Sequence, residues 1–209
     1  MIAVLKSKNL LTVDEYLAQE RAAEERHQYL DGQVFAMAGE SDEHGDISTN
    51  VVGLFHAHLR GKRCRPRGGN SRIRSGPAAP VSGKRTKGMF SYPDVVVICG
   101  EVEYHDRFRD VIINPTMIVE VLSQSTESFD RGEKFTRYQQ WNPTLRDYVL
   151  ISQDKPQIEH FHRLPDGAWK YKLYTGIKAS IKLPSIQITL KLAEVYERVE
   201  FPAESDEKA

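Results

Sequence analysis

The stretch Thr116-Met117-Ile118-Val119-Glu120-Val121-Leu122 decides the fold that we expect for this chain. Five of its seven residues are large and apolar, and no turn-forming residue interrupts them. Such a run is typical of a central strand that is covered on both faces. Glu120 lies in its middle, where an ionised carboxylate is strongly unfavourable unless it is paired, hydrogen-bonded or bound to a cation.

A second apolar run, Pro93-Asp94-Val95-Val96-Val97-Ile98, carries an acid at its start. Two hydrophobic strands with one acid each predict two carboxylates on neighbouring strands, which is a common way to build a site for a hard divalent cation. Other interpretations stay open. Glu120 could be satisfied by an arginine or by backbone donors, and Asp94 could mark the turn before its strand.

Length and composition indicate one domain, which we place at residues 1–200, followed by a polar, disordered tail at 201–209. The chain has 209 residues, of which 40% are hydrophobic and 28% charged, enough for a core and a soluble surface. No stretch approaches the roughly 20 apolar residues that cross a bilayer. The N-terminal residues do not resemble a secretory signal, so we expect a cytoplasmic location and no membrane partner.

The two cysteines, Cys64 and Cys99, lie far apart and do not form a CxxC motif. In a cytoplasmic protein such cysteines are expected to be reduced. We therefore predict neither a disulfide nor a zinc site that uses them.

Basic residues are concentrated in one segment, although the net charge is zero. No acid lies between residues 60 and 87, where ten basic residues stand: Arg60, Lys62, Arg63, Arg65, Arg67, Arg72, Arg74, Lys84, Arg85 and Lys87. Such a cluster is the electrostatic footprint expected for contact with phosphate groups. The alternative is a solvated loop whose counter-charges lie elsewhere on the fold.

The first half of the chain predicts two helices and a hairpin. Thr12 and Glu15 form a capping box that starts the first helix. Asp31-Gly32 separates two β-capable runs and predicts a hairpin turn. The second helix starts at Ser41 and Asp42 and ends at Gly61, with an apolar stripe formed by Ile47, Val51, Leu54, Phe55 and Leu59.

The second half predicts mostly strands. A helix is expected from Asp130 to Trp141, ended by Asn142-Pro143, and a last helix from Leu192 to Val199. Tyr138 and Trp141 are expected in the core. Around these helices we expect strands near 71–74, 94–98, 116–122, 147–151, 157–162, 169–175 and 181–183. This order indicates an α/β or α+β domain with a mixed central sheet.

Several short motifs then line up in a fixed order. They are Asp31-Gly32, His44 at a helix start, Pro93-Asp94-Val95, Val119-Glu120-Val121-Leu122-Ser123 and Asp130-Arg131-Gly132-Glu133-Lys134. In order and spacing the chain resembles the Uma family of predicted endonucleases, long catalogued as a domain of unknown function. The resemblance extends from about Leu11 to Val199.

This resemblance implies membership of the PD-(D/E)XK nuclease superfamily, with a restriction-endonuclease-like fold and an αβββαβ core. It implies that Asp94 and Glu120 are catalytic and hold magnesium, with manganese as an alternative. The superfamily lysine usually follows the second acid by two residues, but Leu122 stands there. Lys134, on the next helix, is the expected substitute. Its alternative role is a surface ion pair with Asp130, four residues earlier.

The chain departs from the family at two further positions. Gln28 and Asn70 stand where many relatives have Glu and Asp. Two functions therefore stay open by resemblance: a magnesium-dependent DNA endonuclease, expected to act as a homodimer, or a catalytically silent module that binds nucleic acid. A third is a protein-interaction domain in which the acids are structural.

The remaining candidate residues are histidines and arginines. His44, near a helix N-terminus, is expected to be neutral and to accept a proton or contact a phosphate, or else to face solvent. His56 and His58 diverge on their helix, and His160 and His162 share a strand face without a third ligand, so we predict no metal site there. Five arginines are expected to hold the nucleic-acid backbone: Arg63, Arg65, Arg67, Arg72 and Arg74.

Overall fold

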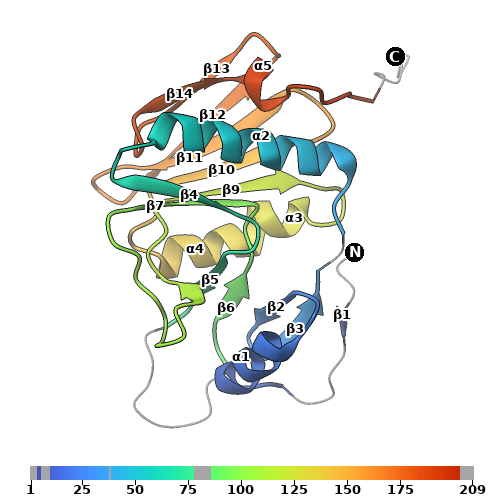
Figure 1. Ribbon diagram of the computed structural model, residues 1–209, viewed down its shortest axis with the longest axis vertical. Coiled ribbons are helices and arrows are strands. Elements are labelled where there is room, and N and C mark those ends of the chain that lie inside the picture. The colour runs from blue at the N-terminus through green and yellow to red at the C-terminus, as the bar shows by residue number, and fades with distance from the viewer. Residues whose placement is uncertain (1–3, 6–9, 38, 78–85, 203–209) are drawn as a thin grey trace.

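The computed structural model describes residues 4–5, 10–37, 39–77 and 86–202 (Figure 1). Lys84 and Arg85 of the basic segment, and residues 203–209 of the expected tail, lie outside the described residues. Within the described ranges, no helix is long and apolar enough to cross a membrane.

The central sheet is mixed and has six strands in the order β12-β11-β10-β9-β7-β4. Strands β9 and β10 pair in parallel, while the other neighbours are antiparallel. Every residue of β9 is buried, as the apolar run around Glu120 predicts. The strands are β4 (Cys64–Gly68), β7 (Val95–Cys99), β9 (Met117–Leu122), β10 (Asp147–Ser152), β11 (Gln157–Arg163) and β12 (Trp169–Thr175).

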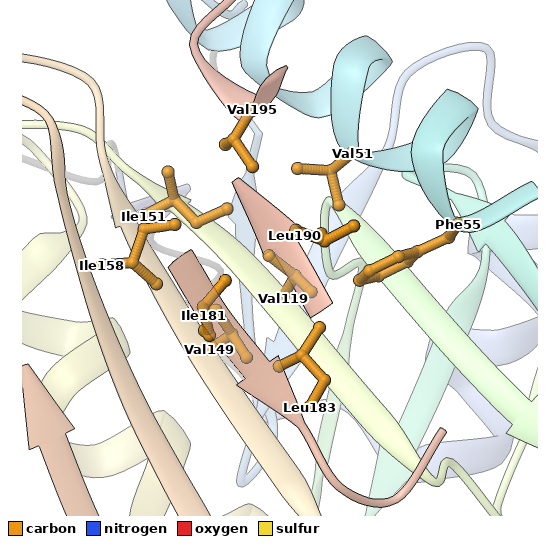
Figure 2. Close-up of a pocket in the computed structure, with 10 residues that line it drawn as sticks. All are labelled: Val51, Phe55, Val119, Val149, Ile151, Ile158, Ile181, Leu183, Leu190 and Val195. Atoms are coloured by element: carbon orange, nitrogen blue, oxygen red, sulfur yellow. The ribbon is translucent and has the colours of Figure 1, made fainter. Parts of the chain in front are cut away.

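One face of this sheet is covered by α2 (Asp42–Leu59) together with β13 (Ser180–Leu183), β14 (Ile188–Lys191) and α5 (Leu192–Val195) (Figure 1). The Ser41 hydroxyl caps α2 by accepting from the His44 backbone N–H. Figure 2 shows apolar side chains from the helix, the sheet and the hairpin converging on one small pocket. This layer is the main hydrophobic core.

The opposite face is covered by one continuous helical segment. It consists of α3 (Glu127–Phe129), a π-helical turn at Asp130–Lys134 and α4 (Phe135–Trp141). The segment begins at Glu127, so the predicted start at Asp130 is wrong. The chain turns earlier because the Ser123 carbonyl accepts from the Thr126 and Glu127 backbone N–H groups.

The elements of the central sheet and its two covering helices come along the chain in the order helix, three strands, helix and strand. They are α2, β4, β7, β9, α4 and β10, with strands of another sheet between some of them. This order confirms the predicted αβββαβ core and the mixed α+β class. The last helix ends at Val195 instead of Val199, and β14 was not expected.

A second sheet of six strands, not predicted from the sequence, has the order β1-β3-β2-β6-β5-β8. The hairpin at Asp31 and Gly32 is confirmed, since both residues have the positive φ angles of a tight turn, 46° and 94°. Helix α1 (Val13–Ala22) packs on this sheet. Its strands are β1 (Val4–Leu5), β2 (His27–Leu30), β3 (Gln33–Ala36), β5 (Arg72–Ser75), β6 (Met89–Ser91) and β8 (Val111–Ile112).

The basic segment contains two strands where the sequence predicted one. β4 is an edge strand of the central sheet, and β5 belongs to the second sheet. The chain therefore crosses between the sheets in the few residues after Gly68.

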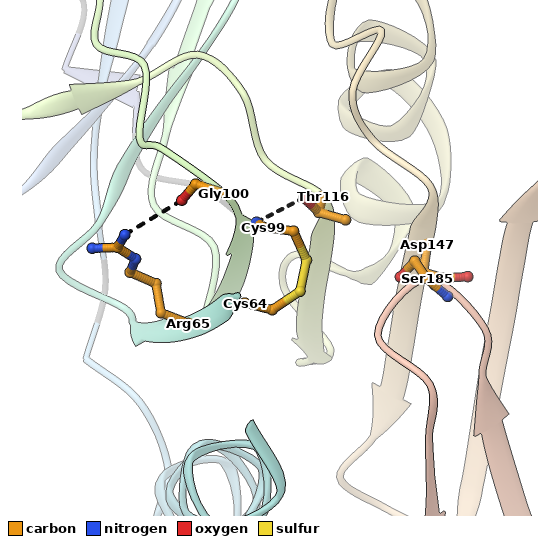
Figure 3. Close-up of a disulfide and its surroundings, with 7 residues drawn as sticks. All are labelled: Cys64, Arg65, Cys99, Gly100, Thr116, Asp147 and Ser185. Atoms are coloured by element: carbon orange, nitrogen blue, oxygen red, sulfur yellow. Dashed lines mark hydrogen bonds between the residues drawn. A yellow bond between two sulfur atoms is a disulfide. The ribbon is translucent and has the colours of Figure 1, made fainter. Parts of the chain in front are cut away.

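Cys64 and Cys99 form a disulfide between β4 and β7, so the expectation of two reduced cysteines is wrong (Figure 3). The two residues stand directly opposite each other in the antiparallel register, with Cα atoms 3.9 Å apart. Sequence spacing gives no sign of this pairing, because it depends on which strands become neighbours.

Candidate active site

A buried ion pair lies on the face of the central sheet that the helical segment covers. Lys134 Nζ lies 2.8 Å from Glu120 Oε1 and 2.9 Å from Asp130 Oδ1. All three side chains are only 4% exposed. The expected surface pair between Lys134 and Asp130 exists, but it is buried and shared with the central strand.

Burial and charge move the pKa values of this cluster. Burial raises the pKa of Glu120, and the nearby Asp130 and Asp94 raise it further, against the lowering effect of Lys134. Burial lowers the pKa of Lys134, but Asp130 and Glu120 outweigh it, so the pKa of this amine lies well above its usual value. Lys134 is therefore protonated at neutral pH.

Tyr138 and Ser91 extend the cluster towards the second sheet. The Tyr138 hydroxyl donates to Glu120 Oε1 at 3.4 Å and lies 2.8 Å from the Ser91 hydroxyl. Tyr138 is fully buried, as predicted, but its hydroxyl also faces the acid in the central strand. Trp141 is half-buried at the end of the same helix.

Asp94 stands just before β7, beside the centre of β9. The antiparallel register pairs Val95 with Val119, which brings Asp94 opposite Glu120. Asp94 Oδ2 accepts the Val121 backbone N–H at 2.6 Å, and Oδ1 lies 2.9 Å from His44 Nε2. This carboxylate thus connects two strands and the first turn of α2.

His44 differs from its sequence expectation. Burial lowers its pKa, but the hydrogen bond and charge of Asp94 outweigh burial, so the pKa of His44 is raised. This direction runs against the expectation of a neutral histidine, and the Asp94 carboxylate is the main cause of the rise. His44 is also not solvent-facing, since its side chain is 12% exposed.

The donor set fits a divalent cation. Asp130 and Asp94 both lie close enough to Glu120 to act on its charge, and Glu120 and Asp130 both pair with Lys134. Glu120 Oε1 contacts Lys134 and Tyr138. Carboxylate oxygens are the ligands that Mg²⁺ prefers, so Asp94 and Glu120 supply donors of the kind that such a cation takes.

The three arginines of β4 line the edge of the central sheet. Arg63, just before the strand, and Arg65 are exposed, and Arg67 is half-buried. Arg65 donates to the Gly100 carbonyl, and Arg67 to the Tyr104 hydroxyl.

The two arginines of β5 are directed into the protein. Arg72 is 8% exposed, donates to the Tyr92 hydroxyl at 2.7 Å and pairs with Asp110 at 3.4 Å. Arg74 is half-buried and donates to the Pro77 carbonyl. These contacts run against the prediction that Arg72 holds a nucleic-acid backbone, because its charge is already neutralised inside the fold.

The structure thus brings Asp94, Glu120, Lys134 and His44 together and separates the five arginines into two groups. Sequence reasoning missed the buried role of Asp130. The only signal was its spacing of four residues before Lys134, which looks the same for a surface pair and for a buried one. The contact between Tyr138 and Ser91 had no sequence signal.

The αβββαβ core is that of the restriction-endonuclease-like fold. A family model named Uma2 and described as "Putative restriction endonuclease" matches residues 13–193. The chain therefore belongs to the Uma2 family.

Two uncharacterised proteins and one solved structure are also similar to this chain. One uncharacterised protein of Synechocystis sp. is 37% identical over 194 residues, which cover 91% of this chain and 94% of the relative. Another from the same organism is 28% identical over 185 residues, which cover 88% and 99%. A crystal structure from Anabaena variabilis, titled as a putative nuclease belonging to DUF820, matches with a TM-score of 0.68. It covers 89% of this chain and 97% of its own at 15% identity, so it shows that the fold is shared.

Proposed function

We propose that this protein is a metal-dependent endonuclease that hydrolyses DNA phosphodiester bonds. The observation that carries the proposal is the buried cluster of Glu120, Lys134 and Asp130 beside Asp94, at the centre of the αβββαβ core. Burying this much charge is costly for stability, so its presence in a strand centre favours a functional role.

Asp94 and Glu120 are the residues that would hold magnesium, with manganese as an alternative. When bound, such a cation lowers the pKa of a water ligand and offsets negative charge on the reacting phosphate. Asp94 is held in position by the Val121 N–H and by His44. Lys134 and Tyr138 hold Glu120 in position through its Oε1 atom.

Lys134 acts as a cation in this proposal. Because the neighbouring acids raise its pKa, the ammonium group keeps its proton and is not a base. Its two ion pairs fix its position next to Glu120, so its charge is in place before substrate arrives. Such fixed charges stabilise the negative charge that develops during hydrolysis.

His44 has a different part from the one expected. Its raised pKa favours the protonated form, so we assign it as a hydrogen-bond donor to Asp94 instead of a proton acceptor. In this role it orients the carboxylate and offsets part of the local negative charge.

The nucleic acid would lie along β4, the edge strand that carries Arg65 and Arg67 and that follows Arg63. The end of β4 pairs with the start of β7, so this edge leads to Asp94. Contacts from arginines to phosphates hold the backbone without reading bases. Cleavage of both strands of a duplex would require a homodimer, which we include in the proposal.

The test is nicking of supercoiled plasmid in magnesium and then in manganese. The intact chain should nick, and Glu120→Gln should lower the rate by about 10²-fold or more, because a ligand of the cation is lost while the side-chain volume is kept. Lys134→Met should also lose activity. Glu127→Gln removes an acid of the same helical segment whose side chain is 46% exposed and pairs with Arg131, so it is the matched control and should nick normally.

The opposite result has a clear meaning. If neither metal supports nicking while the chain still retards DNA at low salt, the protein is the catalytically silent binding module. If Glu120→Gln nicks as fast as the intact chain, the assigned site is wrong.

A further inference from the structure

A second cluster of metal-ligating side chains lies outside the candidate active site. Asp147 begins β10, and His160 and His162 are on β11. Asp147 Oδ1 lies 2.7 Å from His160 Nε2 and 2.6 Å from His162 Nδ1. The expectation that the two histidines have no third ligand is therefore wrong, because Asp147 stands between them.

The strand register explains why these residues meet. In the antiparallel pair of β10 and β11, Asp147 is opposite His162, and Val149 is opposite His160. Side chains two residues apart on a strand point to the same face. All three potential ligands therefore point to the face on which Val149 packs in the main core, the face that α2 covers.

This cluster is separate from the acid–lysine site. Glu120 pairs with Leu150, three residues after Asp147 on β10, so the carboxylates of Glu120 and Asp147 lie on opposite faces of the sheet. Asp147 pairs with Met117 at the start of β9. Neither histidine is used in the proposed hydrolysis.

The turn between β13 and β14 closes the cluster. The Ser185 backbone N–H donates to Asp147 Oδ2 at 3.1 Å, and the two residues lie side by side in Figure 3. The hydroxyl of the same serine is buried and has no hydrogen-bond partner among the described residues. A buried hydroxyl without a partner is unfavourable, which indicates that a further group belongs here.

We propose that Asp147, His160 and His162 form a binding site for a divalent transition metal, with zinc as its natural class of occupant. Two imidazole nitrogens and one carboxylate oxygen are a common ligand set for zinc, whereas magnesium prefers oxygen ligands alone. Three protein ligands leave the fourth position of a tetrahedral ion for water or for a nearby hydroxyl.

The distances fit this assignment with little movement. The three ligand atoms lie within 4.8 Å of one another. Around a tetrahedral zinc ion with bonds of ~2.0–2.2 Å they would be ~3.3 Å apart. Each imidazole would open away from Asp147 by less than ~1 Å and carry its proton on the nitrogen that faces away from the ion. The ion then takes the place of two hydrogen bonds.

The burial of the three side chains and the charge of Asp147 also fit a metal site. The side chains of Asp147 and His160 are 0% and 5% exposed, while His162 is 25% exposed and gives an entry path from solvent. Burial raises the pKa of Asp147, but hydrogen bonds from His160, Ser185 and His162 outweigh burial and lower it.

A bound ion would fasten the C-terminal hairpin to the central sheet. Asp147 Oδ1 would coordinate the ion while Oδ2 keeps the Ser185 N–H, so β10, β11 and the β13–β14 turn become linked at one point. Because a ligand of the folded state stabilises it by mass action, zinc should raise the melting temperature.

The test uses the full chain, free of affinity tags and stripped with a chelator. Zinc titrated by calorimetry should bind one ion per chain, and magnesium should not displace it. His162→Gln removes the most exposed ligand and should lower the affinity for zinc. Loss of an outer-shell residue that supports a ligand lowers metal affinity roughly 10–100-fold, so loss of a ligand itself should cost at least as much. His58→Gln, an exposed histidine on α2, is the matched control and should bind as the intact chain does.

Cobalt gives a second measurement on the intact chain that does not depend on any variant. Cobalt(II) bound to these three ligands in a four-coordinate site should give visible absorption that zinc abolishes. The proposal is overturned if no such band appears, or if a folded His162→Gln binds zinc as tightly as the intact chain.

Discussion

Lys134 is a buried cation that lies between two buried acids, Glu120 and Asp130. Replacing it with methionine keeps the volume but leaves Glu120 and Asp130 buried together without a partner. Breaking a buried ion pair in this way costs about 3–5 kcal/mol of unfolding free energy. Since the remaining carboxylates can take up protons, the cost should be full at pH 8 and smaller at pH 5.

Urea unfolding of Lys134→Met in a chelator, at both pH values, measures this cost. The double variant Glu120→Gln/Lys134→Met should recover part of the lost stability, because it removes one of the unpaired charges. If Lys134→Met loses the same unfolding free energy at pH 8 and at pH 5, the loss does not come from leaving Glu120 and Asp130 without their shared cation.

Single residues also show how far the sequence alone could lead. Glu120 is visible because a charge in an apolar run conflicts with burial, and Asp94 follows from the same conflict. The role of Asp130 cannot be predicted from the sequence, since an acid four residues before a lysine has the same spacing in a buried pair as in an exposed one. Asp147 is likewise hidden, because its contacts with His160 and His162 exist only once β10 and β11 are in register.

At the scale of elements, the helical segment of residues 127–141 joins the two sheets. Arg137 donates to both oxygens of Asp31 in the β2–β3 turn, at 3.2 and 2.6 Å. On the same side, Asn142 accepts from Ser75 of β5. The second sheet is therefore attached to the helix that carries Lys134.

Asp31→Asn tests this attachment. The Arg137 hydrogen bonds lower the pKa of Asp31 against the effect of burial, so the ion pair stabilises the fold above the unfolded-state pKa of ~3.9 and is lost as the pH falls through the lower folded-state value. Asparagine tolerates the positive φ of this turn and keeps one oxygen to accept the Gly88 N–H, while it removes the charge and one acceptor of the Arg137 hydrogen bonds.

Because Asp31 is 41% exposed, the expected loss at pH 7 is about 1 kcal/mol or less. The difference between Asp31→Asn and the intact chain should disappear near pH 2.5, which urea unfolding at the two pH values measures. A loss of the same size at both pH values would assign the effect to the turn itself and not to the ion pair.

Elements were predictable in proportion to their length. The capping box of α1, the apolar stripe of α2 and the apolar run on both sides of Glu120 in β9 contain enough residues for their patterns to be visible. β6 and β8 have three and two residues, too few for any period, and β6 is the strand that connects β5 with the hairpin in the second sheet. Missing them meant missing that sheet.

At the scale of the whole molecule, a net charge of zero hides an uneven surface. The exposed Arg63 and Arg65 lie at the β4 edge of the central sheet, and the exposed Lys170 and Lys172 lie on β12 at the other edge. Only the first edge leads to Asp94, so only that edge should contact DNA.

Arg63→Gln/Arg65→Gln should weaken DNA binding and reduce the slope of log affinity against log salt by about two, since each phosphate contact contributes about one. Lys170→Gln/Lys172→Gln, with the same change in charge, should leave the slope unchanged. Fluorescence anisotropy at several salt concentrations measures both. Equal slopes for the two double variants would exclude the β4 edge as the contact surface.

The second sheet also bears on how the chain is made, because its strands come from separate parts of the sequence. β2 pairs with β3 nearby, but it also pairs with β6, about sixty residues later, and the sheet ends with β8. During synthesis on the ribosome, the N-terminal hairpin must wait for these later strands to emerge before its second edge is covered. Nascent chains stopped before Met89 should therefore expose the β2 edge of the hairpin, which chaperones recognise.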